Sequence, residues 1–200
     1  MVYSFKSIVA SCEGLYKEKG SKFHAYAFPV ANEEEIKQHL NELRKKHFDA
    51  RHHCYAFRLG PDGTHYRAND DQEPSGTAGK PIHGQLLSFG LTNILLVVVR
   101  YFGGTKLGAS GLIHAYKSAA EDALKQCVVV EHDVMKAIEL EFPYERYNDV
   151  MRFVRETHSK IIQQQLEEPS RIQLEIPLKN EQTLHDRCER YHEIKFIEEQ

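Results

Sequence analysis

Four glycines and one lysine crowd the stretch RYFGGTKLGASGLIHAY, which covers residues 100–116. A glycine-rich turn between a strand and a helix can present backbone N–H groups and the positive helix end to an anion. The glycine spacing differs from the G-x-G-x-x-G dinucleotide fingerprint. It fits the first half of a P-loop, but in the Ala109-Ser110 pair that follows, Ala109 stands where that motif needs Lys. Nucleotide hydrolysis of the P-loop kind is therefore disfavoured, while anion binding and a tight structural turn stay as alternatives.

Positive charge gathers around this turn. His114 and Lys117 fall in the first two turns of the helix predicted to follow it, where the helix dipole disfavours cations. An external anion would stabilise them; alternatively, the glycines only permit left-handed turns and the cations face solvent. Tyr101 and Phe102 could stack on RNA bases, although the RNP pattern of common RNA-binding domains is absent. From this stretch the predicted anion or RNA site comprises Arg100, Tyr101, Gly103, Gly104, Lys106, Gly108, His114 and Lys117.

A second glycine-containing segment, NDDQEPSGTAGKP at residues 69–81, places acids ahead of small residues and a lysine. It adds four residues to the predicted anion site, namely Ser75, Gly76, Thr77 and Lys80. Asp70, Asp71 and Glu73 are candidate metal ligands, because clustered carboxylates can hold Mg²⁺ beside a phosphate. The alternative is a solvated acidic turn before a helix that starts at Thr77 or Pro81. The sequence pattern requires no cofactor. If one is bound, Mg²⁺ is the cofactor that these acids would hold.

The segment RHHC at residues 51–54 contains zinc-ligand types. Neighbouring strand residues point to opposite faces, so His52 and His53 do not easily share an ion. Cys54 with a histidine would form a nucleophilic pair, but the spacing does not separate this arrangement from a buried cysteine. Packing and surface roles are the favoured interpretation.

The 200-residue chain is 41% hydrophobic, enough for a substantial core in one large or two small domains. Its longest strongly apolar run, ILLVVV at 94–99, is far shorter than the roughly 20 residues of a membrane-spanning helix. No charged-then-apolar leader opens the chain. The cysteines, none in a C-x-x-C pair, argue against a zinc knuckle and a disulfide framework. We therefore expect a cytoplasmic protein with no membrane partner.

The net charge of -3 is divided unequally along the chain. Residues 1–130 carry 16 Lys and Arg against 13 Asp and Glu, whereas residues 131–200 carry 10 against 16. The two parts are therefore +3 and -6. A surface for an anion or nucleic acid is expected in the first part.

Hydrophobic periodicity predicts the elements that position these segments. Asn32 is expected to cap a helix that buries Ile36, Leu40 and Leu43, with acids in its first turn and bases in its last. The first part should contain strand 22–30, this helix, strand 52–59, a long polar loop 60–80, a helix near 81–89, strand 93–101 and a helix over 110–127.

The second part reads as β-α-β-β-α-β, the order of a ferredoxin-like domain. Its expected elements are strand 134–142, helix 145–158, strand 160–168, strand 171–178, helix 181–191 and strand 193–199. Strand 171–178 alternates Ile172, Leu174 and Ile176 toward the core. We therefore predict two domains, residues 1–130 and 131–200.

Three stretches together resemble the signatures of the YigZ/IMPACT family: ARHHCYAF at 50–57, EPSGTAGKP at 73–81, and VVVRYFGGTKLG at 97–108 followed by GL. The segment EKGSKFHAYAFPV at 18–30 resembles the opening strand of that family. Two departures lie in loops. Gln72 replaces the glycine expected before Glu73, and Ala109-Ser110 replaces a more glycine-rich pair.

The resemblance implies an α+β fold of two domains. The first would be a β-α domain like that of a ribosomal small-subunit protein and of domain IV of elongation factor G; the ferredoxin-like second would resemble domain V. Eukaryotic relatives regulate translation by competing for an activator of the starvation-sensing kinase, and a bacterial-type chain would need another target. The resemblance transfers no enzymatic reaction to particular residues.

The favoured hypothesis is a cytoplasmic, non-enzymatic factor in translation regulation. It would bind RNA, the ribosome or a translation-related protein through the basic first domain. The first alternative is an enzyme or binding protein for a phosphorylated small molecule or nucleotide, with Mg²⁺ held by the acids. A third hypothesis is a protein-interaction module that docks through its acidic second domain.

Overall fold

The computed structural model describes residues 1–197, and the chain divides into two compact units. Residues Phe5–His132 form the larger unit, and Met1–Ser4 join the chain from Asp133 onward in the smaller one. Both units mix helices and strands, so the predicted two-domain organisation of an α+β protein is confirmed. Within residues 1–197, no helix has both the length and the apolar composition for crossing a bilayer.

The larger unit is built on an antiparallel five-stranded sheet in the order β2-β3-β6-β4-β5. Its strands are β2 (Cys12–Glu18), β3 (Ser21–Pro29), β4 (His52–Leu59), β5 (His65–Asn69) and β6 (Ile94–Tyr101). The ILLVVV run forms the central strand β6, whose burial on both faces explains why it is continuously apolar. A separate two-stranded ladder joins β1 (Ser4–Ile8) to β7 (Val129–Asp133).

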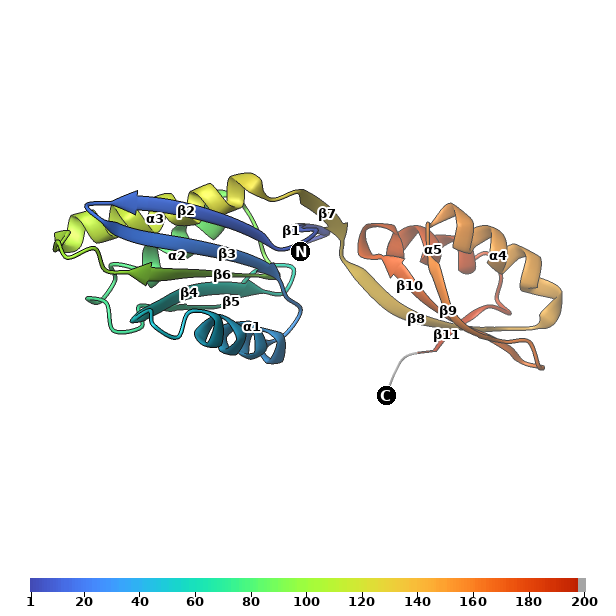
Figure 1. Ribbon diagram of the computed structural model, residues 1–200. Coiled ribbons are helices and arrows are strands. Elements are labelled where there is room, and N and C mark those ends of the chain that lie inside the picture. Colours follow the sequence, from blue (N-terminus) through green and yellow to red (C-terminus); the bar gives the residue numbers. More distant parts are fainter. Residues whose placement is uncertain (198–200) are drawn as a thin grey trace. The chain divides into compact units, whose positions relative to one another are not determined.

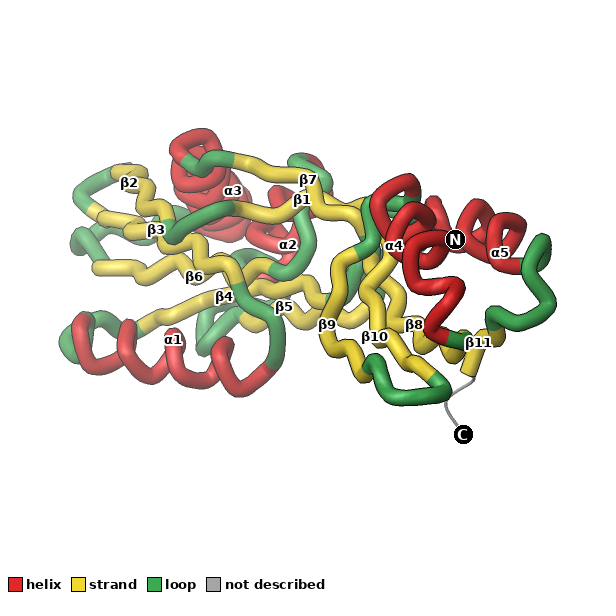
Figure 2. Tube along the Cα trace, turned by 90° about the vertical axis from the view of Figure 1, so that its right-hand side faces the viewer, coloured by secondary structure: helices red, strands yellow, loops and turns green. Residues whose placement is uncertain are grey.

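Helices cover both faces of this sheet. Helix α1 (Glu33–Lys46) packs on one face, while α2 (Gly79–Ser88) and α3 (Gly108–Gln126) pack on the other, as Figures 1 and 2 show. The predicted cap of α1 is confirmed, because Asn32 Oδ1 accepts a hydrogen bond from the Glu35 N–H at 3.0 Å. The alanine-rich face of α3 lies against the sheet, which allows close approach to it.

The smaller unit contains a four-stranded antiparallel sheet in the order β11-β8-β10-β9, with two helices packed on one face (Figure 1). Its elements are β8 (Met135–Phe142), a 3-10 turn η1 (Tyr144–Arg146), α4 (Tyr147–Glu156), β9 (Lys160–Gln165), β10 (Ser170–Pro177), a second 3-10 turn η2 (Leu178–Asn180), α5 (Glu181–Cys188) and β11 (Lys195–Ile197). The strand predicted over 193–199 is thus shorter among the described residues, and positions 198 and 199 lie outside them.

The predicted elements miss several strands. The loop expected over residues 60–80 contains β5, whose first four side chains are exposed at the sheet edge and therefore show no apolar alternation. Strands β1, β2 and β7 were not predicted either. Helix α2 begins at Gly79 and α3 at Gly108, each two residues before its expected start.

Cys12 and Cys127 form a disulfide, with their Cα atoms 5.5 Å apart. The cysteine spacing argued against a disulfide framework, and this single bridge was not expected. The two residues are separated by 115 positions, and only the packing of α3 against β2 brings them together. The other cysteines, Cys54 and Cys188, are free and buried.

Candidate functional site

Arg100, at the end of β6, is buried and paired with Glu73 of the EPSGTAGKP segment. Its Nη1 lies 2.6 Å from Glu73 Oε1, and the two side chains are 7% and 3% exposed. The Tyr116 hydroxyl of α3 donates to the same carboxylate oxygen at 2.8 Å. Breaking such a buried pair costs about 3–5 kcal/mol, because the remaining charge is left unpaired. The charge of Arg100 therefore stabilises the fold by pairing with Glu73. Arg100 is not an exposed cation that could contact an external anion, contrary to the prediction from the sequence.

Asp70 caps helix α2 from outside the helix. Its Oδ1 accepts hydrogen bonds from the N–H groups of Ala78 and Gly79 at 3.0 and 2.8 Å, and its Oδ2 accepts one from Gly76 at 2.9 Å. Burial opposes ionisation, but the three N–H donors outweigh it and lower the pKa of Asp70. The anion at this glycine turn is therefore the protein's own carboxylate. Neither Gly76 nor Gly79 has its N–H free for a phosphate.

The other acids of the segment also have protein partners. Asp71 Oδ2 accepts a hydrogen bond from the His53 N–H at 2.7 Å, and the Asp71 carbonyl lies 2.9 Å from His52 Nδ1. With Asp70 capping α2 and Glu73 bound to Arg100, the carboxylates predicted to hold Mg²⁺ serve to fix the loop instead. The loop is bent sharply, and Gln72 has φ 70, which explains why a glycine is expected there.

Cys54 is part of the same buried layer. Its thiol donates to the Asp70 carbonyl at 3.0 Å and lies 3.3 Å from the Tyr116 hydroxyl. Burial raises the pKa of the Cys54 thiol far above its ordinary value. A thiol that stays protonated is a poor nucleophile, so the interpretation as a buried packing residue is favoured over a catalytic cysteine.

The glycines of the β6–α3 turn have two different roles. Gly103 packs against the Gly20–Ser21 backbone so closely that an added Cβ would collide with it, and its N–H donates to Ser21 Oγ at 3.1 Å. Gly104 and Gly108 have φ 86 and 73 and face open space. They let the chain turn sharply into α3, whose start has no side-chain cap and no acid in its first turn.

Cations remain exposed around this turn. Lys106 lies in the turn itself, and Lys80 lies in the first turn of α2. His114 lies in the second turn of α3 on its solvent side, whereas Lys117, predicted within the first two turns, lies midway along the helix because α3 begins at Gly108. None of these three lysines forms an ion pair with another described residue; Glu121 on α3 pairs with Lys125 at 2.6 Å, and Lys125 first, with a smaller effect of Lys117, lowers the pKa of Glu121. The ring of His114 makes an edge contact with the Tyr16 ring. These side chains are free to meet an external anion.

Tyr101 belongs to a hydrogen-bond chain that the sequence did not indicate. The Tyr101 hydroxyl donates to Asp49 Oδ1 at 3.0 Å, so it must accept from His47 Nδ1–H at 2.9 Å. His47 Nε2 then accepts from the Tyr26 hydroxyl at 2.8 Å. This chain requires neutral His47, in agreement with a pKa lowered by burial and by nearby Lys46. This hydrogen-bond chain could not be predicted from the sequence, because the residues that form it come from three segments far apart in the chain.

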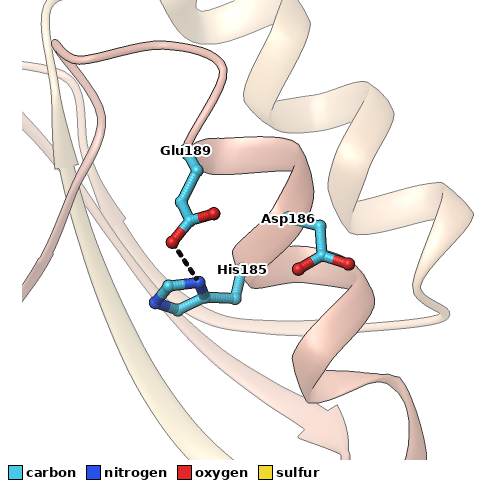
Figure 3. A group of neighbouring side chains, drawn as sticks. All are labelled: His185, Asp186 and Glu189. Atoms are coloured by element: carbon cyan, nitrogen blue, oxygen red, sulfur yellow. Dashed lines mark ion pairs between the residues drawn. The ribbon is translucent and has the colours of Figure 1, made fainter.

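Among residues 1–197, one further group has metal-ligand types within reach of one another: His185, Asp186 and Glu189. In Figure 3, His185 Nδ1 faces Glu189, at a distance of 3.1 Å, while Asp186 accepts a hydrogen bond from the Gln182 amide at 2.8 Å. All three side chains are exposed and each has a protein partner. The group is explained by the surface pairs that residues four positions apart form on a helix.

Comparisons with known proteins identify the family. A family model described as the Impact N-terminal domain matches residues 19–124. IMPACT family member YvyE of Bacillus subtilis (strain 168) is 34% identical over 157 residues, which cover 78% of this chain and 72% of the relative. IMPACT family member YigZ of Escherichia coli (strain K12) is 36% identical over 146 residues, which cover 72% of each chain.

A solved structure of a hypothetical protein superposes with a TM-score of 0.74 at 28% identity and covers all of both chains. The family model and the two relatives cover the segments that surround the Arg100–Glu73 pair and the glycine turns. The chain therefore belongs to the IMPACT family, together with the bacterial members YvyE and YigZ.

Proposed function

We propose that this protein is a non-enzymatic factor in translation regulation that binds RNA through its larger unit. The observation that carries the proposal is a pair of exposed cations without a close ion pair: Lys106, in the turn before the uncapped start of α3, and Lys117, midway along that helix. Positive charge near a helix N-terminus is unfavourable within the protein alone, and a phosphate would offset it. The glycines of the turn let the backbone approach such a phosphate closely.

The contrast between the two glycine turns supports RNA over a phosphorylated small molecule. At the start of α2 the carboxylate of Asp70 already takes the N–H groups, and Glu73 is bound to Arg100. A metal-dependent enzyme would need these acids and N–H groups free for its ligand. Lys106 before α3 and Lys117 midway along it are exposed at separate positions, as electrostatic contact with several phosphates of an RNA backbone requires.

The fold and the family support the same proposal. The smaller unit has the order β-α-β-β-α-β with sheet order β11-β8-β10-β9, which we assign as ferredoxin-like. For the larger unit we adopt the β-α type of a ribosomal small-subunit protein and of elongation factor G domain IV, as the family resemblance implies. Domains of this kind act on the ribosome, so ribosomal RNA or tRNA is the proposed ligand.

The proposal is tested by electrophoretic mobility shift of tRNA and 16S ribosomal RNA fragments over a range of salt concentrations. Double substitution Lys106→Ala and Lys117→Ala should weaken binding at least tenfold, since a charge-assisted contact contributes about 1.5–3 kcal/mol. The slope of log Kobs against log salt should fall by roughly 2 for two lost phosphate contacts. Lys37→Ala, which removes an exposed lysine from α1, is the matched control.

Equal losses in the double variant and in the control, or binding that does not respond to salt, would contradict the proposal. If no RNA binds but a ribosomal or translation-factor protein is retained, the role in translation stands with a protein partner instead.

A further inference from the structure

On the α1 side, the face of the five-stranded sheet is open at β2 and at the beginning of β3, since Tyr26 and Phe28 farther along β3 pack with α1. Strand register places Lys17 of β2 directly opposite Lys22 of β3, and Lys22 directly opposite Tyr101 of β6. In the next row, Leu15 is opposite His24. Helix α1 covers the apolar side chains of this face on the central strands, whereas Lys17 and Lys22 are exposed.

This pair of lysines is unfavourable for the fold. Like charges directly opposite each other on neighbouring strands repel and destabilise a sheet. Neither Lys17 nor Lys22 forms an ion pair with any of the residues the structure describes. The surrounding charge is also mostly positive. Burial and then Lys22 lower the pKa of His24, Lys46 and Lys17 act in the same direction, and Glu13 opposes them. The repulsion between Lys17 and Lys22 weakens the sheet, and no anionic side chain of the described residues pairs with them. An anion bound from outside the protein would reduce this repulsion.

An aromatic hollow adjoins the lysine pair. It has a volume of about 510 Å³, within the range of small-molecule sites, and it is lined by Gly20, Lys22, His24, His47, Asp49, Tyr101 and Phe102. Phe102 is 55% exposed; the Arg100 guanidinium lies over its ring at 5.6 Å, and a base would stack on the remaining exposed part of the ring. The hydrogen-bond chain through His47 holds the Tyr101 side chain in place. Cations and aromatic rings around one hollow are the combination that nucleotides bind.

We infer that this hollow binds one nucleotide unit, with its phosphate at Lys17 and Lys22 and its base beside Phe102. Asp49 decides the orientation, because its carboxylate would repel a phosphate in the hollow but accept an N–H group of a base. Neither Lys106 nor Lys117 lines this hollow. The inference rests on the proposed function in one respect: we take the nucleotide unit to be part of a single-stranded RNA and not a free nucleotide.

Two titrations of the full-length protein test the site. In the first, AMP is added to ¹⁵N-labelled protein and amide shifts are followed by NMR. In the second, a fluorescent 12-nucleotide oligo(A) is followed by anisotropy. We expect AMP to shift the amides of Lys22, His24 and Phe102. Lys17→Ala with Lys22→Ala should weaken both ligands at least tenfold, and Phe102→Leu, which keeps the apolar bulk but removes the ring, should weaken them severalfold. Lys37→Ala, the control, should leave both affinities unchanged.

Each outcome has a separate meaning. If AMP shifts no amide of β2, β3 or the β6–α3 turn, or if Lys37→Ala weakens binding as much as the lysine pair, the inference is wrong. If AMP binds through Lys17 and Lys22 while oligo(A) does not, the site stands with a free nucleotide as its ligand. If the lysine-pair variant keeps full affinity for AMP and oligo(A) while Lys106→Ala with Lys117→Ala loses tRNA, the hollow is not a nucleotide site and the proposed function survives.

Discussion

Asp70 has a different role in the structure from the one that its position in the sequence suggests. In the sequence it stands beside Asp71 in an acidic segment, with the appearance of a metal ligand. In the fold its carboxylate accepts three backbone N–H groups and supplies the negative charge that the start of α2 requires. An internal carboxylate in this place competes with any external phosphate.

The role of Asp70 gives a pH-dependent prediction. Asp70→Asn should lower the free energy of unfolding at pH 7 by roughly 2 kcal/mol, because hydrogen bonds to a charged acceptor contribute about 1.5–3 kcal/mol. The folded-state pKa of Asp70 is lowered, so the wild-type advantage is full above the unfolded pKa of about 3.9. It is lost as the pH falls through the folded-state pKa.

Urea unfolding of both proteins between pH 7 and pH 2.5 measures this difference. Exposed Asp186→Asn is the control and should change stability by less than about 0.5 kcal/mol at every pH. A difference between wild type and Asp70→Asn that is constant over the whole range would show that the charge of Asp70 is not what caps α2.

At the scale of elements, edge strand β2 depends on helix α3. Gly14 of β2 lies against the Ala123 backbone so closely that an added Cβ would collide with it, and the Leu15 N–H donates to the Asp122 carboxylate at 2.9 Å. The Cys12–Cys127 disulfide fastens the same strand to the residue that ends α3. Since Lys17 lies on β2, the proposed nucleotide site depends on the placement of this strand.

Removal of the disulfide should therefore destabilise the larger unit. Cys127→Ser should lower the free energy of unfolding by about 2–4 kcal/mol in non-reducing buffer, because the unfolded chain is no longer cross-linked over 115 residues. In reducing buffer the wild type loses the same cross-link, and the difference should shrink to a small packing effect. Denaturant unfolding with and without reductant measures both. Reduction that leaves wild-type stability unchanged would contradict this role.

At the scale of the whole molecule, the two units have separate cores and unequal charge. The larger unit has buried clusters on both faces of its sheet, while the core of the smaller unit is made of side chains from its own sheet and helices. The basic excess lies in residues 1–130 and the acidic excess in residues 131–200. RNA affinity and the stability of the smaller unit should therefore respond to different substitutions.

Leu174→Ala tests this separation. Leu174 of β10 is 1% exposed, and truncation of such a side chain costs about 2–5 kcal/mol. Scanning calorimetry should show a lowered transition for the smaller unit, while tRNA affinity at a temperature below that transition stays at the wild-type value. A loss of affinity at that temperature would move the binding surface to the acidic unit and favour the protein-docking hypothesis.

Features that depend on neighbouring residues could be predicted from the sequence. The cap and apolar face of α1, the buried strand β6 and the element order of the smaller unit follow from periodicity and capping, which act over a few positions. The quoted motifs also identified the IMPACT family. Strands β1, β5 and β7 were missed because each has only five residues and little apolar alternation. Strand β2 was missed because its more buried face consists of Cys12, Gly14, Tyr16 and Glu18, which are not a run of apolar types.

Contacts between distant residues could be identified only from the folded chain. Glu73 neutralises Arg100, Cys12 joins Cys127, and Lys17, Lys22 and Tyr101 form one row across three strands. These contacts depend on sheet order and strand register, which are set by packing of the whole core and not by any local pattern. For this reason the glycine turn could be recognised from the sequence. The pairing of Arg100 with Glu73 and the hollow beside Lys22 could not.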